Sequence, residues 1–202
     1  MLAILEREKT GKGQRVETSL LTTALTMTNN LVMEQKLLNK NRIASNNRAQ
    51  TSAPADTFQT KDGWILVHTV GQPLFERWVK LMNEPEWVDD PRFKDDISRG
   101  DNGELISKRM AEWCKSRTSK EVLTELDKAR IPGGEVLKAE EVLEEPHIIA
   151  RKLFLDLEYK NLQESAPVMV PPIELSQNSG SIRSSAPLLG EHTEQIMIEI
   201  GY

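Results

Sequence analysis

The sequence predicts a mixed α/β or α+β protein, and three observations support that prediction. Apolar residues recur at helical spacing near both ends of the chain. The middle region combines short β-rich runs with amphipathic helical stretches. The two ends also carry more apolar helix surface than the few strands near them could cover. We therefore expect a fold that is not self-contained.

The composition is typical of a soluble globular protein. The 202 residues allow one large domain or two small ones, and 38% are hydrophobic and 28% charged. A net charge of -5 argues against nucleic acid or an anionic membrane as the main partner. No apolar run approaches the roughly 20 residues of a membrane span. Glu6 and Glu8 interrupt the first apolar stretch, unlike a signal peptide, and the single Cys114 excludes an internal disulfide. We expect a cytoplasmic protein.

Two helices are predicted before the middle region. Residues 1–9 place apolar side chains on one side at helical spacing, and Gly11 supplies a stop that tolerates the left-handed conformation. Residues 18–38 continue the same periodicity, which predicts one long helix. Its many Thr and Asn residues give a middling helix propensity, so this helix depends on packing. Residues 39–56 are polar and contain Pro54, which is typical of a loop.

The middle region begins with a predicted hairpin in "TFQTKDGWILVHTV", where Lys61-Asp62-Gly63 forms the turn. Amphipathic patterns then predict helices over 73–83 and 104–115. Thr118 and Glu121 form a capping box at the start of the next helix, which ends at Pro132-Gly133-Gly134.

The last part of the chain predicts a short helix over 139–144 and two strands in "LFLDLEY" and "PVMVPPIELS". The segment "KNLQESA" forms the turn between the strands. A final helix starts near Glu191 and ends at Gly201.

The residues alone identify no catalytic or metal site. Gly11-Lys12-Gly13-Gln14 lacks the spacing of a phosphate-binding loop and follows a helix instead of a strand, so we interpret it as a turn. The three histidines have no second ligand at metal-binding spacing. Cys114 lies on the apolar face of a predicted helix, which favours a core thiol over a nucleophile. Acid pairs such as Asp89-Asp90 sit beside turns and are interpreted as solvated charges.

Several stretches nevertheless resemble one known family when they are taken together and in order. They are "AILEREKTGKGQRVETSLLTTAL", "FQTKDGWILV", "EPEWVDDPRF", "RIPGGEV" and "APLLGEHTEQIMIEIGY". This series is similar to the family III CoA-transferases, which include formyl-CoA and carnitine CoA-transferases and the related α-methylacyl-CoA racemases. The likeness covers essentially the whole chain.

The resemblance implies an interlocked homodimer of the α/β class. Each subunit has a Rossmann-like large domain, built from both ends of its chain, and a small α+β domain. On this likeness, residues 1–38 are a helical part of the large domain and 39–56 are a linker or substrate loop. Residues 57–160 are the small domain, and 161–202 return to the large domain. The N-terminal half of the family fold is missing from this sequence.

The resemblance also implies a reaction. In the family, an Asp carboxylate attacks an acyl-CoA, the mixed anhydride is opened by CoA, and the aspartyl-CoA thioester receives a second acid. Coenzyme A is thus a substrate, and no cofactor is implied. That Asp precedes the segment matching "LAILEREKTGKGQ", and no carboxylate here holds its position. We therefore expect no catalytic residue in this chain, which needs the missing half as a partner and is inactive alone.

Two departures from the family patterns bear on the substrate. The segment "NNRAQTSAPAD" contains no glycine where formyl-CoA transferases carry a glycine-rich loop, which argues against formyl or oxalyl transfer. Gln72 holds the place of a racemase acid/base Glu, and an amide cannot move a proton in that role. A transferase is therefore favoured over a racemase, and a non-catalytic interaction module is the third reading. The resemblance suggests four residues for the rim of the substrate cleft: Asn47, Arg48, Gln50 and Gln72.

Overall fold

The computed structural model describes residues 1–202, and their contacts divide the chain into two units, Met1–Glu135 and Val136–Tyr202. All buried residues belong to the first unit, and most of those with apolar side chains form one core. The architecture is mixed α/β, as the sequence predicts. The domain limits at 38, 56 and 160 stay predictions, because contacts within this chain do not test membership of a larger fold.

The first unit begins with three helices, α1 (Leu2–Thr10), α2 (Leu20–Met27) and α3 (Asn29–Leu38). Gly11 ends α1 in the left-handed conformation, as predicted. The single helix expected over 18–38 is wrong, because the chain leaves helical geometry at Thr28, where φ is -107°. The Thr28 hydroxyl donates to the Ala24 carbonyl oxygen at 2.9 Å. Such bonds from a β-branched residue compete with regular helix geometry.

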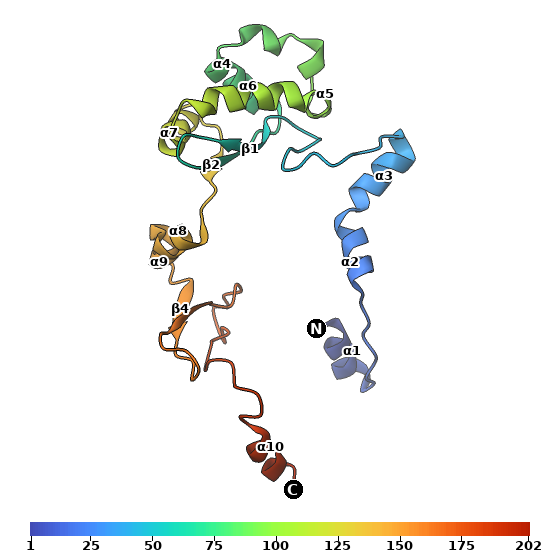
Figure 1. The fold of residues 1–202 in the computed structure, drawn as a ribbon. Coiled ribbons are helices and arrows are strands. Elements are labelled where there is room, and N and C mark those ends of the chain that lie inside the picture. Colours follow the sequence, from blue (N-terminus) through green and yellow to red (C-terminus); the bar gives the residue numbers. More distant parts are fainter. The chain divides into compact units, whose positions relative to one another are not determined.

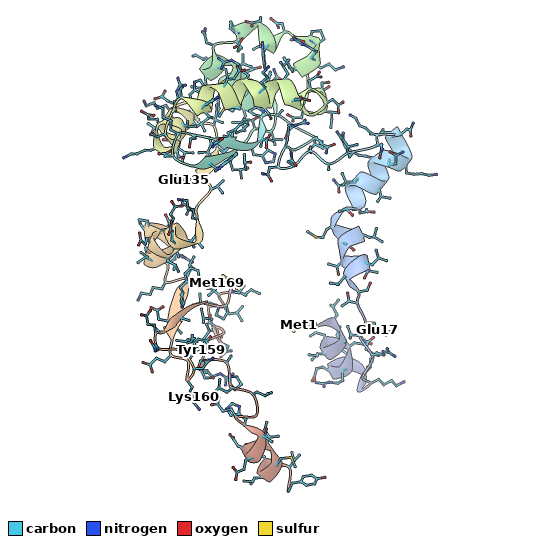
Figure 2. All side chains as sticks on the ribbon, viewed as in Figure 1. Met1, Glu17, Glu135, Tyr159, Lys160 and Met169 are labelled. Carbon is cyan, nitrogen blue, oxygen red and sulfur yellow. The ribbon has the colours of Figure 1, made fainter.

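None of the residues in α1, α2 and α3 is buried. The helix between Met1 and Glu17 carries its side chains outward, whereas side chains crowd together around the sheet and helices that follow (Figure 2). Leucines such as Leu21 and Leu25 are more than half exposed. The expectation that these helices lack a packing partner within the chain is confirmed.

A three-stranded antiparallel sheet follows, ordered β1 (Ala55–Gln59), β2 (Trp64–His68) and β3 (Gly133–Glu135). The predicted hairpin is confirmed, with Ala55 opposite His68 and Gln59 opposite Trp64. Ile65 and Val67 point into the core, whereas their neighbours on β2 are exposed. β3 was not predicted. It forms where a helix end was expected, and it is defined by its pairing with β2.

The hairpin turn is bonded to a helix far along the chain. The Asp62 carboxylate accepts hydrogen bonds from the Ser119 backbone N–H at 2.8 Å and the Thr60 hydroxyl at 3.1 Å. These bonds, the Ser119 one above all, lower the pKa of Asp62. The Lys61 N–H donates to the Arg117 carbonyl oxygen at 2.9 Å. The turn is therefore fixed by tertiary contacts as well as by its own sequence.

Helices cover this sheet, and α6 runs along the sheet (Figure 1). In the sequence, α5 precedes α6 and α7 follows it. The capping box of Thr118 and Glu121 at the start of α7 is confirmed. Short α5 was not predicted. The helical elements are α4 (Gln72–Met82), α5 (Asp96–Asp101), α6 (Gly103–Lys115), α7 (Ser119–Lys128) and 3-10 turns at Pro85–Val88 and Pro91–Phe93.

Aromatic residues form the centre of the core. The ring of Trp78, on α4, lies 5.8 Å from that of Phe75 and 5.7 Å from that of Trp87. Its indole N–H points at the Met110 sulfur on α6, at 3.3 Å. The tryptophan thus joins α4 to α6 and to the first 3-10 turn.

The second unit contains α8 (Ala139–Glu144), α9 (Pro146–Ala150), β4 (Phe154–Leu157), β5 (Ala166–Met169) and α10 (Thr193–Glu199). The strands pair antiparallel, with Phe154 opposite Met169, which confirms the predicted pair. None of the residues in this unit is buried. No helix in either unit combines the length and apolar character that crossing a lipid bilayer requires.

Candidate functional site

The four predicted rim residues lie at two places in the first unit. Asn47, Arg48 and Gln50 belong to the loop between α3 and β1, and Gln72 is the first residue of α4. Asn47 is exposed, and its side-chain amide donates to the Thr57 hydroxyl at 2.9 Å. The other three are half-buried.

The loop holds itself in shape through short-range hydrogen bonds. The Ser45 hydroxyl donates to the Arg48 carbonyl oxygen at 2.7 Å, and the Ala49 N–H donates to the Ala55 carbonyl oxygen at 2.8 Å. The Gln50 side-chain amide donates to the Ser45 hydroxyl at 2.8 Å and to the Ile43 carbonyl oxygen. The Gln50 side chain therefore stabilises its own loop, while its backbone carbonyl oxygen accepts a hydrogen bond from Arg42.

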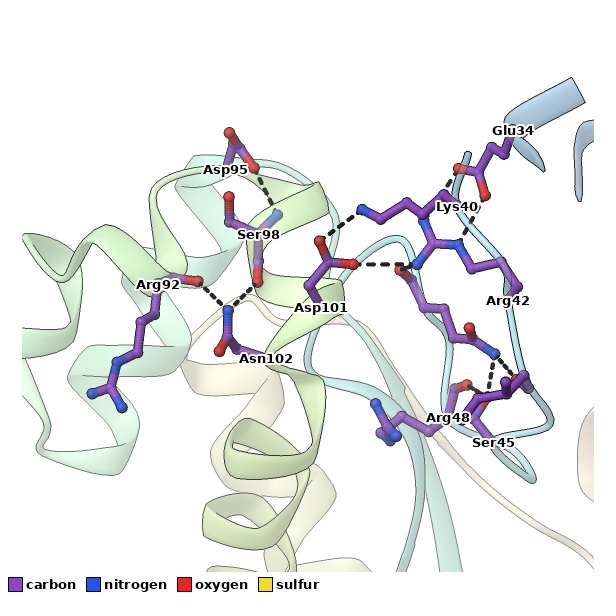
Figure 3. Close-up of polar contacts among 12 residues, drawn as sticks. Glu34, Lys40, Arg42, Ser45, Arg48, Arg92, Asp95, Ser98, Asp101 and Asn102 are labelled. Atoms are coloured by element: carbon purple, nitrogen blue, oxygen red, sulfur yellow. Dashed lines mark hydrogen bonds and ion pairs between the residues drawn. The ribbon is translucent and has the colours of Figure 1, made fainter. Parts of the chain in front are cut away.

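Arg42 connects this loop to two helices (Figure 3). Its guanidinium forms two hydrogen bonds to the Glu34 carboxylate on α3, at 2.8 and 3.2 Å, and donates to the Gln50 carbonyl oxygen at 2.7 Å. It also contacts Asp101 on α5 at 3.3 Å, and the Lys40 ammonium meets the same carboxylate at 2.7 Å. The bonds between Arg42 and Glu34 raise the pKa of the first and lower that of the second. Arg42 was not among the residues predicted from the sequence.

Gln72 is held by a buried arginine. Its side-chain oxygen accepts a hydrogen bond from the Arg99 guanidinium at 2.7 Å, and its amide nitrogen donates to Glu76 at 3.0 Å. Arg99 is only 1% exposed, although it belongs to a short polar stretch of α5. Both polar ends of the Gln72 amide are thus engaged.

Arg99 makes three further contacts around the start of α4. Its guanidinium donates to the Phe93 carbonyl oxygen at 2.9 Å and to the Asp96 carboxylate at 2.8 Å. It also lies 4.6 Å from the centre of the Phe75 ring. The Asp96 carboxylate accepts from the Gly71 N–H at 2.9 and 3.0 Å. These contacts join α5 to the first turn of α4.

Beside the loop, an open hollow of about 760 Å³ is lined by Asn47 and Arg48 among others. Lys108 adds a second cation, and Trp64 adds an aromatic wall. Asp56 and Glu104 also line it, so both signs of charge are present. Gln50 and Gln72 do not line this hollow. The structure therefore brings two of the four predicted residues to one surface depression. The roles predicted for all four stay predictions.

Cys114 is buried in the core, and burial raises the pKa of its thiol to about 12. We expect no reaction with a disulfide reagent such as DTNB in mildly alkaline buffer, and one equivalent after unfolding in guanidinium chloride. Because the folded chain holds the thiol proton more tightly than the unfolded chain, the free energy of unfolding should also fall as the pH rises through the ordinary thiol range. Rapid reaction of the folded protein would contradict this placement.

Possible metal ligands do not gather anywhere in the structure: no group of three or more His, Cys, Asp or Glu side chains is placed to hold an ion. The side chain of His68 is exposed, and its ring nitrogen lies 3.2 Å from the Ser52 hydroxyl. His147 and His192 are exposed in the second unit. The arrangement thus offers cations, amides and an aromatic wall for binding.

The mixed α/β fold, the ordered loop and the hollow beside it define a candidate binding surface. The chain belongs to CoA-transferase family III, whose sequence model matches residues 1–193. The resemblance inferred from the sequence is thereby confirmed.

Three similar proteins illustrate the relationship. The chain is 27% identical to the succinyl-CoA–D-citramalate CoA-transferase of Chloroflexus aurantiacus, over 99% of this chain and 50% of that protein. It is 30% identical to the succinyl-CoA–L-malate CoA-transferase beta subunit of the same organism, again over 99% and 50%. The crystal structure of a CAIB/BAIF family protein from Brucella suis matches 98% of this chain and 50% of its own, with a TM-score of 0.73 and 24% identity.

The chain therefore spans about half the length of the curated relatives it matches. The structural likeness shows the fold alone. It nevertheless agrees with the predicted fold class, since half of a CAIB/BAIF family chain has the same arrangement of helices and small sheets.

Proposed function

We propose that this chain forms the C-terminal half of a CoA-transferase that moves CoA from succinyl-CoA to a short dicarboxylic acid. The observation that carries the proposal is the family match over nearly the whole chain, combined with relatives of twice its length. The two curated relatives described above are both named for a succinyl-CoA donor and a hydroxylated dicarboxylic acceptor.

The reaction uses a nucleophilic Asp supplied by the other half. Its carboxylate attacks the succinyl thioester carbonyl, and the C–S bond breaks to give a mixed anhydride and CoA thiolate. The thiolate then attacks the aspartyl carbonyl and releases succinate. The acceptor carboxylate attacks the resulting aspartyl-CoA thioester, and CoA thiolate finally opens the second anhydride to form the new acyl-CoA. CoA enters as a substrate, and no resident cofactor takes part.

Six of the chain's own carboxylates are held in structural contacts. Each carboxylate with an altered pKa has it lowered, because it accepts hydrogen bonds from a cation, a hydroxyl or a backbone amide; these are Glu34, Asp62, Asp90, Asp95, Glu121 and Glu191. Such carboxylates are already committed to structural contacts.

In this proposal the hollow beside the loop receives the acceptor acid. A dicarboxylic acid that reacts through one carboxylate presents the other for recognition. Arg48 and Lys108 line the hollow, and a guanidinium matches a carboxylate in a two-bond geometry. Trp64 supplies apolar contact for the carbon chain between them. Asn47 lies at the edge of the same depression.

The exposed apolar faces of α1, α2, α3 and α10 support a larger assembly. In the proposed enzyme they pack against the other half of the subunit, within an interlocked homodimer. A stable, monodisperse 202-residue monomer would favour the interaction-module alternative instead.

The proposal is tested by expressing the chain alone and together with a polypeptide from the same genome that matches the first half of the family. Formation of malyl-CoA and citramalyl-CoA from succinyl-CoA is followed by liquid chromatography. We expect no transfer by the chain alone and transfer by the two polypeptides together, here called the reconstituted enzyme. A complex that forms but transfers no CoA, or transfer by the chain alone, would overturn the proposal.

Two controls sharpen this test. Arg48→Met should raise the KM for the acceptor about tenfold, while Arg151→Met, an exposed arginine of the second unit, should leave it unchanged. Solvent deuterium should not enter the acyl α-carbon. Incorporation would instead indicate the racemase class, for which Gln72 lacks the required carboxylate.

A further inference from the structure

Helix α5 touches the loop of Gln50 through a glycine that cannot be replaced without displacement. Gly100 is buried, and a Cβ atom there would clash with the Gln50 carbonyl oxygen. The same Cβ would lie 2.6 Å from the Gln50 carbonyl carbon and 2.8 Å from the Thr51 nitrogen. Those neighbours are backbone atoms, so no side-chain rotation relieves the contact. The backbones of α5 and the loop therefore lie in direct contact at this point.

The residues on either side of Gly100 hold two other parts of the candidate site. Arg99 donates to Gln72 at 2.7 Å. Asp101 binds Lys40 and Arg42, and Arg42 in turn donates to the Gln50 carbonyl oxygen at 2.7 Å. Successive side chains of a helix project about 100° apart, so three neighbouring residues can contact three different parts of the structure.

The contacts of Asp101 determine the position of the loop as well as its stability. Its side chain is 42% exposed and that of Lys40 is 30% exposed, and ion pairs at such positions contribute little to stability. What they do determine is position, because Asp101 is bonded to two cations that flank the start of the loop. Figure 3 shows Asp101 on its helix, joined by ion pairs to Lys40 and Arg42.

We propose that Arg99, Gly100 and Asp101 form a positioning element, which fixes the loop of Arg48 and Gln50 against α5 and the start of α4. It thereby sets the fit of the acceptor acid in the hollow that Arg48 lines. The effect on the acceptor acid rests on the proposed function. The positioning of the loop by α5 does not depend on it. None of the three is assigned contact with a substrate. They act through Gln72, the Gln50 backbone and Arg42.

The first test measures hydrogen exchange in the 202-residue chain. In Gly100→Ala and Asp101→Ala, the Arg48 and Ala49 amides, which are bonded within the loop, should exchange about tenfold faster. The β2 amides should be unchanged. The matched controls are Gly13→Ala, where a Cβ meets open space, and Asp127→Ala, an exposed acid on α7. Unchanged loop exchange in both α5 variants would overturn the proposal, as would equal acceleration throughout the unit in Asp101→Ala.

The second test uses the reconstituted enzyme. Asp101→Ala should raise the KM for the acceptor acid about tenfold and leave kcat within about threefold, since the reacting groups are untouched. A loss confined to kcat would contradict a positioning role. An inactive wild-type complex would count against the proposed function alone, because the exchange experiment decides the positioning of the loop independently.

Discussion

Replacement of Trp78 by alanine should lower the free energy of unfolding of the first unit by about 4 kcal/mol. The side chain is fully buried between Phe75, Trp87 and Met110. Alanine removes the apolar contacts with both rings and leaves a cavity that these elements cannot fill without moving. The loss is measured by urea unfolding followed by far-ultraviolet circular dichroism.

Trp64 provides the matched control, because its side chain is 46% exposed on the outer face of β2. Trp64→Ala should cost less than about 1.5 kcal/mol, since little buried contact is lost. If Trp78→Ala does not fold, Trp78→Phe keeps part of the ring packing and should lose about half as much stability. Equal losses of stability at the two sites would contradict the burial of Trp78 in the core.

Replacement of Arg99 by methionine should cost about 3 kcal/mol, the second largest effect. Methionine fills a similar volume but donates no hydrogen bond. The change removes the donors to the Phe93 carbonyl, the Gln72 side chain and the Asp96 carboxylate. Asp96 keeps its bonds from Gly71 and is partly exposed, so water offsets some of its loss.

Arg92 is the comparison for this change. It pairs with Asp90 at 2.6 Å, but its side chain is 56% exposed. Arg92→Met should therefore cost less than about 1 kcal/mol. Chemical unfolding of the two variants under the same conditions measures the difference. A loss at position 99 no larger than that at position 92 would mean that the Arg99 network contributes no more than a surface pair.

Local chemistry made several elements predictable. The hairpin combines a turn at Lys61-Asp62-Gly63 with alternation along β2, so neighbouring residues alone indicate it. The start of α7 is equally local, because Thr118 and Glu121 satisfy each other's backbone groups within one turn.

Elements that depend on distant partners were not found. β3 contains two glycines and an acid, a sequence with no strand pattern, and it is a strand because β2 supplies the hydrogen-bonding edge. The break at Thr28 was missed for a different reason. The apolar spacing continues through it, and the spacing of apolar residues does not register a hydroxyl that bonds to Ala24.

The candidate site shows the same limit. The loop itself was predicted from its polar composition, and the four rim residues, three in the loop and Gln72 on α4, came from the family resemblance. Arg42, Arg99 and Gly100 were not singled out, because a buried arginine and a contact glycine look like surface residues in a polar stretch. Their importance follows from groups that lie far from them in sequence, such as Gln50 and Gln72.

The bonds between the hairpin turn and α7 have a practical consequence for protein engineering. Hairpin tips are ordinarily chosen for inserting tags, fluorophores or binding peptides, because exposed turns tolerate added residues. Here the tip is tethered through Lys61 and Asp62 to the residues that begin α7. An insertion between them would pull on the helix as well as on the two strands. The turn between β4 and β5, which carries no buried residue, is the better place to graft a reporter.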